Sequence, residues 1–489
     1  MSLPPGSPEA LYHVVPHPDD EEVNASQIEL AGETAAEPVL PPMDLPPFLV
    51  DARIRWIHFI LGCSVLLPWN VVITAMPFFL SRLSSSPLRS TFGSYLTTTF
   101  TVSNFVFLAH ATLTSKQSSP SRQTRFSIIW LTILNFFLTL STFFVPSPGV
   151  LFAFVLFNGV AQACAGAYLQ TSVIAVASRF GPPAVQAMMS GQAAVAVAVS
   201  GVQVISAAAS VMGKTHSYVS DGSAEERSAF MFFSLSTLFL IASAAANTWM
   251  VRMPVYQHIA ASLEKPPKKS LAEDGHEDER RGLMSDHPHD DPMSDMKSNA
   301  IRVAKANITY EVAVAYIFMV TLAVFPPITT SIQPTNPATH PLLFSAIHFL
   351  VFNVGDLTGR YVCSFPIFAV WSAKRLLTLS AARTLFIPLF LMCNVQRGTS
   401  RIGGTPIINS DFLFMAILFC FGCSNGYVSS LCMMSAPSLE HNPRLKGRTE
   451  DVDVAATVVS FCLVGGLAVG SIASFAVKSA ICGCNPFYG

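Results

Sequence analysis

The segment Ile347–Tyr361, with the sequence IHFLVFNVGDLTGRY, places an aspartate and an arginine inside a long apolar stretch. Asp356 and Arg360 are spaced i, i+4, so a helix carries both on one face, close enough to pair. Asn353 precedes the aspartate by three residues and shares that face. Ionisable side chains within a membrane are costly and usually face the bundle interior or a water-filled cavity. The segment is therefore a candidate functional site, and a purely structural ion pair that locks two helices is the alternative.

The composition of the chain indicates an integral membrane protein. Of its 489 residues, 51% are hydrophobic and 12% are charged, whereas soluble domains contain about 25% charged residues. The net charge of −1 argues against a general affinity for nucleic acid. Most cysteines lie in apolar stretches without histidines at metal-ligand spacing, so they are expected to be packing residues. We expect neither a metal nor a cofactor.

Apolar segments long enough to cross a bilayer, about 20 residues each, fill most of the chain. About eleven such spans are expected at 54–80, 91–114, 126–146, 149–178, 183–211, 229–253, 307–331, 341–371, 376–395, 410–436 and 452–478. Residues 1–50 are rich in proline and are predicted to be a disordered tail. The charged segment 254–305 is also predicted to be disordered. It separates the helices in 51–253 from those in 306–478.

The lysines and arginines predict an orientation. Loops at 116–125, 252–305 and 444–448 carry more of these residues than the loops of the opposite side, and such loops stay in the cytosol. The N-terminus is therefore expected in the cytosol. With an odd number of spans, residues 479–489 lie on the other side of the membrane. Both the plasma membrane and a vacuole- or lysosome-like membrane fit this pattern.

Polar residues inside the predicted spans mark candidate binding positions. The stretch LLPWNVVITA places Trp69 and Asn70 near the middle of the first span. An indole ring offers a flat surface for stacking, and the adjacent amide adds hydrogen-bonding groups. In the fourth span, Gln162 and Gln170 carry amides that suit the edge of a heterocyclic base. Core packing and bonds between helices are the alternatives for these residues.

Two further ionisable residues lie within predicted spans. Arg383 is a second buried cation, for which a neighbouring carbonyl or polar side chain is the expected partner. His348 lies on the face of Asp356 and could sense protons near neutral pH, with a structural histidine as the alternative. An intramembrane enzyme is not expected, because an aspartyl protease needs two aspartates in facing helices and the spans offer one near mid-membrane.

Seven stretches resemble, in the same order, motifs of the equilibrative nucleoside transporter family. They are LLPWNVVITA (66–75), GAYLQ (166–170), MSGQ (189–192), FMVTLAVFP (318–326), FNVGDLTGR (352–360), RTLFIPLFLMCN (383–394) and SNGYVSSLCMMSAP (424–437). The small residues of MSGQ also indicate close helix contact. The resemblance implies an all-α membrane protein of about eleven helices in a 6+5 arrangement, with a fold like that of the major facilitators.

Position by position, the resemblance implies a substrate site in the first half of the chain. Trp69 would lie against the nucleoside, and Gln170 would hydrogen-bond the base. Gly166 would leave room beside the base, and Ile73 would line the pocket as an apolar residue. Asn70 is expected to support this part of the site.

In the second half, the resemblance implies that Asp356 and Arg360 meet the ribose hydroxyls. The carboxylate accepts from the hydroxyls, the guanidinium donates to them, and each keeps the other charged. Asn353 and Arg383 are expected to have supporting roles. Gly355 and Thr358 stand where the family is often bulkier or aromatic, so substrate selectivity, and not the core function, is the property most open to change.

The predicted function is facilitative transport of adenosine- or uridine-like nucleosides, with nucleobases as further candidates. Alternating access around a midplane site is the expected mechanism. The alternative is a proton-coupled carrier of nucleosides, or of another small polar solute, on a similar fold. The expected partners are the nucleoside and the lipid bilayer, and a monomer is expected.

Overall fold

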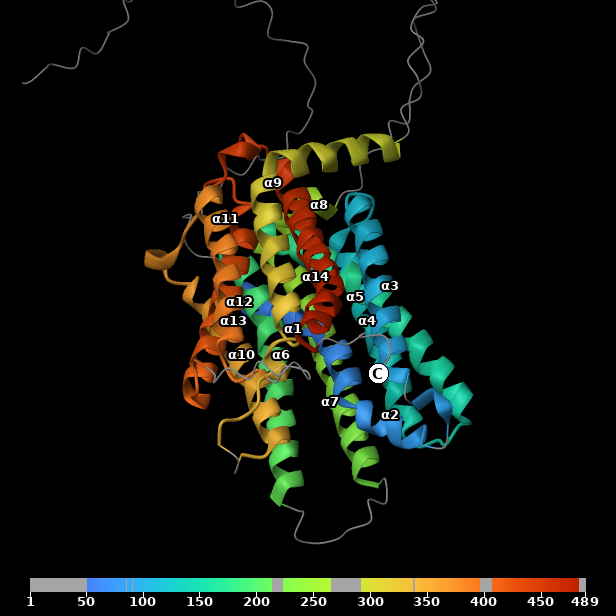
Figure 1. The fold of residues 1–489 in the computed structure, drawn as a ribbon. Helices are drawn as coiled ribbons and strands as arrows, with labels where there is room; N and C mark the ends of the chain where they lie inside the picture. The colour runs from blue at the N-terminus through green and yellow to red at the C-terminus, as the bar shows by residue number, and fades with distance from the viewer. Residues whose placement is uncertain are drawn as a thin grey trace, which may run out of the picture. The chain divides into compact units, whose positions relative to one another are not determined.

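The computed structural model describes residues 51–84, 86–89, 91–212, 223–264, 292–336, 339–395 and 407–482. The predicted disordered tail, residues 1–50, lies outside this part of the chain. The described residues from 51 to 482 form one compact unit, and their regular structure is helical (Figure 1).

The helices of the first half are α1 (Ala52–Thr74), α2 (Met76–Arg82), α3 (Phe92–Leu113), α4 (Pro120–Ser141), α5 (Pro148–Arg179), α6 (Pro182–Met212), α7 (Ser223–Val251) and α8 (Pro254–Glu264). The second half contains α9 (Pro292–Val324), α10 (Pro341–Val362), α11 (Ala373–Ala382), α12 (Phe386–Leu391), α13 (Asp411–Ser435) and α14 (Val452–Cys482). Several begin at a proline, whose fixed φ suits the first helical turn and whose missing N–H costs nothing there.

Most of the predicted spans correspond to single long helices. In the described part of the chain, nine helices are long and apolar enough to cross a membrane. The predicted span 91–114 is the helix α3. The span 376–395 is interrupted: a 3₁₀ turn at Arg383–Leu385 separates α11 from α12. Pro388 lies just beyond this turn and cannot donate the backbone bond that would continue a regular α-helix.

The prediction that residues 254–305 form a disordered loop is wrong at both of its ends. Residues 254–264 form α8, and α9 begins at Pro292; residues 265–291 lie outside the described part. Tyr256 and Ala260 give α8 a buried apolar side. Glu264, at the end of α8, accepts from Ser121 Oγ at 2.8 Å and from the Tyr256 hydroxyl at 2.7 Å. The carboxylate thus lies at the N-terminus of α4, where the helix dipole favours negative charge.

Helices pair in the same pattern in the two halves. In the first half, α1 packs against α6, and α3 packs against α5. In the second half, α9 packs against α14, and α10 packs against α13 (Figure 1). Leaving out the short α2 and counting α11 and α12 as one span, the first span of each half therefore contacts the fifth, and the second contacts the fourth. This correspondence reveals an internal repeat that the sequence did not show.

Glycines bring the backbones of these pairs together. A Cβ at Gly359 of α10 would lie 2.0 Å from the carbonyl oxygen of Cys423 in α13. A Cβ at Gly426 of α13 would lie 1.9 Å from the carbonyl oxygen of Asp356. At Gly191, in the MSGQ stretch of α6, it would lie 2.0 Å from a carbonyl oxygen of α1. The predicted close contact at MSGQ is therefore confirmed, and small residues make these approaches possible.

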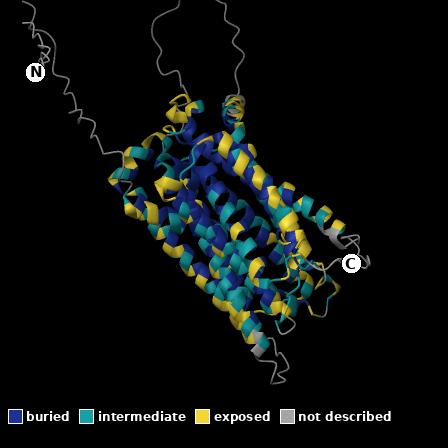
Figure 2. Cartoon of the chain, turned by 60° about the vertical axis from the view of Figure 1, so that its left-hand side comes forward, coloured by how far each residue is buried: buried dark blue, intermediate teal, exposed yellow. Residues whose placement is uncertain are grey.

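Ion pairs join different helices at the two ends of the bundle. At one end of the bundle, Arg179 after α5 pairs with Asp453 at the start of α14, at 2.8 Å. At the other end, Arg82 pairs with Glu226 of α7 at 2.9 Å. Exposed positions lie along the outer helices, whereas buried positions lie between helices (Figure 2). Many of the exposed positions carry large apolar side chains. Such a surface suits a lipid environment.

Candidate functional site

A narrow cleft between α1, α3, α4 and α5 is lined by three of the predicted site residues, Trp69, Gly166 and Gln170. The Trp69 indole stacks on Phe100 of α3, with ring centroids 3.6 Å apart and planes inclined by 11°. A Cβ at Gly166 would meet no atom within 4 Å, so there is open space beside this residue. The structure thus places Trp69, Gly166 and Gln170 around the same cleft.

Gln170 also joins the two halves of the chain. Its Nε2 donates to the hydroxyl of Ser460 in α14 at 2.9 Å. The free volume of the cleft is about 50 Å³, whereas small-molecule sites usually measure about 300–1,000 Å³. In this conformation the cleft is therefore smaller than a typical small-molecule site.

Two of the predicted residues in α1 lie outside this cleft. Ile73 is half-buried one turn after Trp69 and is not part of the cleft lining. Asn70 uses its Nδ2 to donate to the Leu66 carbonyl at 2.9 Å, within its own helix. In this conformation, neither residue is presented to the space beside Trp69.

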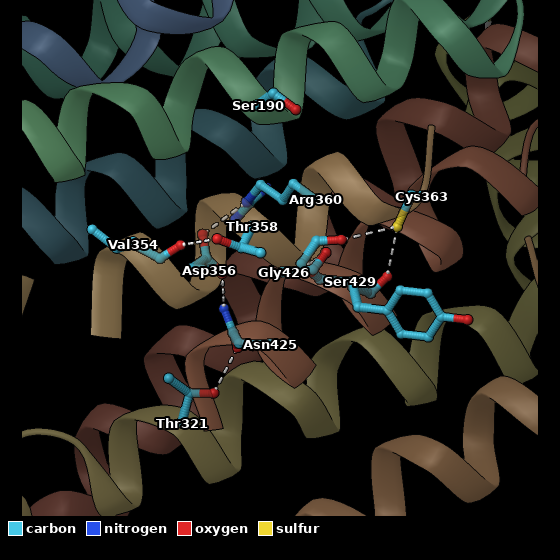
Figure 3. Close-up of polar contacts among 12 residues, drawn as sticks. Ser190, Thr321, Val354, Asp356, Thr358, Arg360, Cys363, Asn425, Gly426 and Ser429 are labelled. Carbon is cyan, nitrogen blue, oxygen red and sulfur yellow. Dashed lines mark hydrogen bonds and ion pairs between the residues drawn. The ribbon is translucent and has the colours of Figure 1, made fainter. Parts of the chain in front are cut away.

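The second group of predicted residues forms a buried polar network in the other half. Asp356 and Arg360 of α10 expose only 7% and 6% of their surfaces. Arg360 Nε donates to Asp356 Oδ2 at 2.8 Å. Asn425 of α13 donates from Nδ2 to Asp356 Oδ1 at 2.6 Å, and its Oδ1 lies 2.8 Å from the Thr321 hydroxyl of α9. Figure 3 shows these side chains in sequence from Arg360 to Thr321.

Arg383 belongs to the same network and is only 1% exposed. Its Nη1 donates to the carbonyl of Phe421 at 3.0 Å and to the Ser424 hydroxyl. Its Nη2 donates to Thr321 Oγ1 at 2.9 Å. The guanidinium also lies over the Phe421 ring, 4.5 Å from the centroid, as a cation–π contact. The prediction that Arg383 partners a carbonyl and polar neighbours is confirmed.

One donor of Arg360 is not used by this network. Arg360 Nη1 is buried and has no hydrogen-bond partner among the described residues. An unmade hydrogen bond at a buried charged group is costly. Asp356 has each oxygen bonded once, and a carboxylate can accept further bonds. The pair can therefore both donate to and accept from a polar ligand.

Helix α6 connects this network to the first half. Asn353 donates to the Ser200 hydroxyl and, at 3.4 Å, to the Ala196 carbonyl. Gln186 Nε2 donates to the backbone carbonyl of Arg360 at 3.1 Å. Asn353 is thus a bridge between halves, in line with its expected supporting role.

His348 is engaged locally. Its Nδ1 lies 2.5 Å from the carbonyl of Ser345 in its own helix, and its Nε2 lies 3.5 Å from the Thr329 hydroxyl. The structural interpretation of this histidine therefore accounts for both of its ring nitrogens.

The sequence reasoning missed Asn425, Thr321 and Gln186 as members of the site. Asn425 and Thr321 stand in the stretches SNGYVSSLCMMSAP and FMVTLAVFP, where each is a polar residue inside an apolar span. That exception to the apolar pattern is the signal that could have identified them. Their connection to Asp356 depends on helix packing, which the sequence does not show.

Known proteins resemble this chain along most of its length. The family model described as "Nucleoside transporter" matches residues 156–479. Equilibrative nucleoside transporter 1 of Rattus norvegicus is 27% identical over 463 residues, which cover 87% of this chain and 96% of that protein. The nucleoside transporter FUN26 of Saccharomyces cerevisiae is 24% identical over 440 residues, covering 85% of this chain and 82% of FUN26.

The solved structures extend the comparison to the fold. The E. coli fucose:proton symporter FucP superposes with a TM-score of 0.50 at 14% identity, over 88% of this chain and 94% of FucP. A structure of FucP described as a major facilitator superfamily transporter in the outward conformation gives a TM-score of 0.51, over 89% and 93% of the two chains. The predicted all-helical, major-facilitator-like fold is confirmed. With the family match over residues 156–479, these findings show that the chain is a multi-pass membrane protein of the equilibrative nucleoside transporter family.

Proposed function

We propose that this protein carries nucleosides across its membrane down their concentration gradient. The observation that carries the proposal is the buried Asp356–Arg360 pair, in which Arg360 Nη1 has no bonding partner in the described part of the chain. A pair of ions that served only to lock two helices would be expected to satisfy its donors internally. The available donor supports a role in binding a ligand.

The chemistry of the pair suits a ribose. Neighbouring sugar hydroxyls can accept from the guanidinium of Arg360 and donate to the carboxylate of Asp356. Asn425 holds the carboxylate from the opposite side, so the carboxylate is positioned before the sugar arrives. Trp69 and Gln170, which line the cleft of the first half, supply a stacking surface and an amide for the base.

The two groups of residues lie in different halves, which supports alternating access. A carrier of this kind opens its central site first to one side and then to the other by moving one half against the other. The cleft beside Trp69 is smaller than a nucleoside needs, so substrate entry is coupled to a movement of the halves. The Gln170–Ser460 bond must then break or re-form during each cycle.

The orientation follows from the positively charged loops. The N-terminus lies in the cytosol, and the end of the bundle that holds the Arg179–Asp453 pair faces the cytosol. The C-terminus lies on the opposite side. The membrane is the plasma membrane or a vacuole- or lysosome-like membrane, and the carrier acts as a monomer.

Uptake of labelled adenosine and uridine into reconstituted vesicles tests this proposal. Asp356→Asn and Arg360→Ala should each lose uptake while the protein still inserts in the membrane. Thr378→Val is the matched control, because the Thr378 hydroxyl bonds only to the Lys374 carbonyl of its own helix, α11, outside this network. Normal uptake by Asp356→Asn would remove the pair from the substrate site.

The same vesicles distinguish facilitated from proton-coupled transport. A facilitative carrier equilibrates the nucleoside without a pH gradient, and an imposed gradient does not drive accumulation above equilibrium. Accumulation driven by the pH gradient would establish the proton-coupled alternative instead.

A further inference from the structure

Gln162 of α5 lines the cleft that holds Trp69 and carries a buried acceptor that is not used. The side chain is only 2% exposed and forms part of the cleft lining. Its Oε1 is buried and has no hydrogen-bond partner in the described portion of the chain. Such a group costs free energy unless water or a ligand satisfies it.

Neighbouring residues determine which atom of the Gln162 amide is the nitrogen and which is the oxygen. Asn158 donates from Nδ2 to the backbone carbonyl of Leu134 at 3.1 Å. A carbonyl can only accept, so the NH₂ group of Asn158 must point at Leu134 and its Oδ1 must point at Gln162. Gln162 therefore donates from Nε2 to Asn158 Oδ1, at 2.7 Å. Exchanging the oxygen and nitrogen of either amide would place two acceptors or two donors against each other and break these bonds. The atom of Gln162 that remains without a partner is therefore the acceptor Oε1.

The helix places this acceptor opposite Gln170. Gln162, Gly166 and Gln170 follow one another at i+4 spacing and share one face of α5. The Cα atoms of the two glutamines are about 12 Å apart along the helix axis, and the glycine between them leaves open space. A flat ring lying over Gly166 would meet an amide at each end.

We propose that Gln162 determines base specificity by accepting a hydrogen bond from an amino group on the edge of the nucleobase. The ligand class is thus a nucleoside whose base carries an exocyclic amine, such as adenosine or cytidine. Asn104 of α3 is half-buried and is also in the cleft lining, so it adds a second amide with both donor and acceptor groups there. The inference rests on the proposed function, because it assigns a role within the same substrate site.

The test compares nucleosides with and without the amine. Adenosine is paired with purine riboside, which has the same ring and sugar but no exocyclic amine; cytidine is paired with its analogue that lacks the 4-amino group. Each is measured as an inhibitor of labelled uridine or adenosine uptake in vesicles. The wild-type protein should prefer the amine-bearing member by roughly 5- to 150-fold, as expected when the amine-free analogue leaves one buried acceptor unsatisfied.

The variant Gln162→Met keeps the length of the side chain and removes the acceptor. Its preference should fall to near unity through weaker inhibition by the amine-bearing nucleoside, while inhibition by the amine-free analogue stays at the wild-type value. The unchanged analogue shows that the variant has folded.

Asn135→Leu is the matched control. Asn135 of α4 also has a buried Oδ1 without a partner among the described residues, but it is not part of the cleft lining. Its removal should leave the preference unchanged.

The outcomes separate the inference from the proposed function. If the wild-type protein transports no nucleoside, the proposed function fails. Two results would overturn the assignment of Gln162 in a protein that does transport nucleosides. One is a wild-type protein with no preference for the amine-bearing nucleosides. The other is a Gln162→Met variant that keeps the wild-type preference in both pairs.

Discussion

Replacing Asp453 with asparagine should open the seam between α5 and α14 at the end of the bundle predicted to face the cytosol. Asp453 accepts from Arg179 Nη2 at 2.8 Å, and the two side chains expose only 5% and 13% of their surfaces. The pair joins the first half of the chain to the second, so it stabilises only conformations in which this end is closed. The seam continues along α14 to Ser460, which bonds to Gln170.

The size of the effect follows from the burial of the pair. A hydrogen bond to a charged group contributes about 1.5–3 kcal/mol, and little of this is screened at these low exposures. Removing that contribution from the closed state shifts the equilibrium toward the open state by roughly 10- to 150-fold, at 1.4 kcal/mol per factor of ten. The shift cannot exceed the difference between what the Arg179–Asp453 pair contributes to the closed state and what it contributes to the open state.

A cysteine at position 457 reports the opening. Asp453, Thr457 and Ser460 are spaced i, i+4 and i+7 and share one face of α14, and Thr457 is 1% exposed. Thr457→Cys should react slowly with a water-soluble maleimide, because the thiol is reached only when the seam opens. Adding Asp453→Asn should accelerate labelling by the factor above, since labelling then follows the open population. The protein without Thr457→Cys gives the background from native cysteines.

Two controls make the result specific. Arg302 pairs with Asp451 at 2.7 Å at the same end, but both residues belong to the second half; Arg302→Gln should leave labelling of position 457 unchanged. The exchanged pair, Arg179→Asp with Asp453→Arg, should return labelling toward the parent rate. Equal labelling of Asp453→Asn and its parent would refute the view that this bridge holds the halves together.

Further expectations concern the packing of the second half and α8. Gly359→Ala should greatly reduce the yield of folded protein, because its Cβ would lie 2.0 Å from a backbone oxygen of α13; Gly149→Ala, with no atom within 4 Å, should leave the yield in detergent unchanged. Arg383→Met should lower the melting temperature measured by thermal aggregation, because four polar contacts lose their donor, and each buried acceptor left unsatisfied costs about 1–3 kcal/mol. Burial and the charge of Glu264 raise the pKa of Tyr256. Its contribution to stability is therefore fully present below the unfolded pKa of about 10 and is lost as pH rises through the higher folded pKa. Tyr256→Phe should accordingly flatten the fall in melting temperature above pH 10, and an unchanged slope would contradict this.

The contacts that the sequence could predict are those set by local geometry. The pairing of Asp356 with Arg360 required only the i, i+4 spacing of a helix, and the structure shows it. Gly166 and Gln170 share a helix face for the same reason. That Trp69 lines the same cleft was expected from the family resemblance and not from spacing.

The contacts that escaped prediction depend on packing between distant segments. Asn425 reaches Asp356 from another helix, and nothing within either segment specifies that approach. The helix α8 was missed because the charged residues that follow it dominate the composition of the segment, while its apolar side consists of a few residues such as Tyr256 and Ala260. Ile73 follows Trp69 by one helical turn but does not line the cleft. Spacing along one helix does not specify which neighbouring helices surround a residue.

The glycine contacts between α10 and α13 have a mechanical consequence for the carrier. Backbones in direct contact at Gly355, Gly359, Gly422 and Gly426 leave no layer of side chains in which one helix could slide or roll over the other. Under the proposed alternating-access mechanism, we therefore expect the two helices to move as one rigid body and to keep the bond between Asp356 and Asn425. We expect the movement to occur instead along the border with α6, which Asn353 bridges. The sugar-binding groups would then reach both sides of the membrane with the same geometry, and this is what an equilibrating carrier needs.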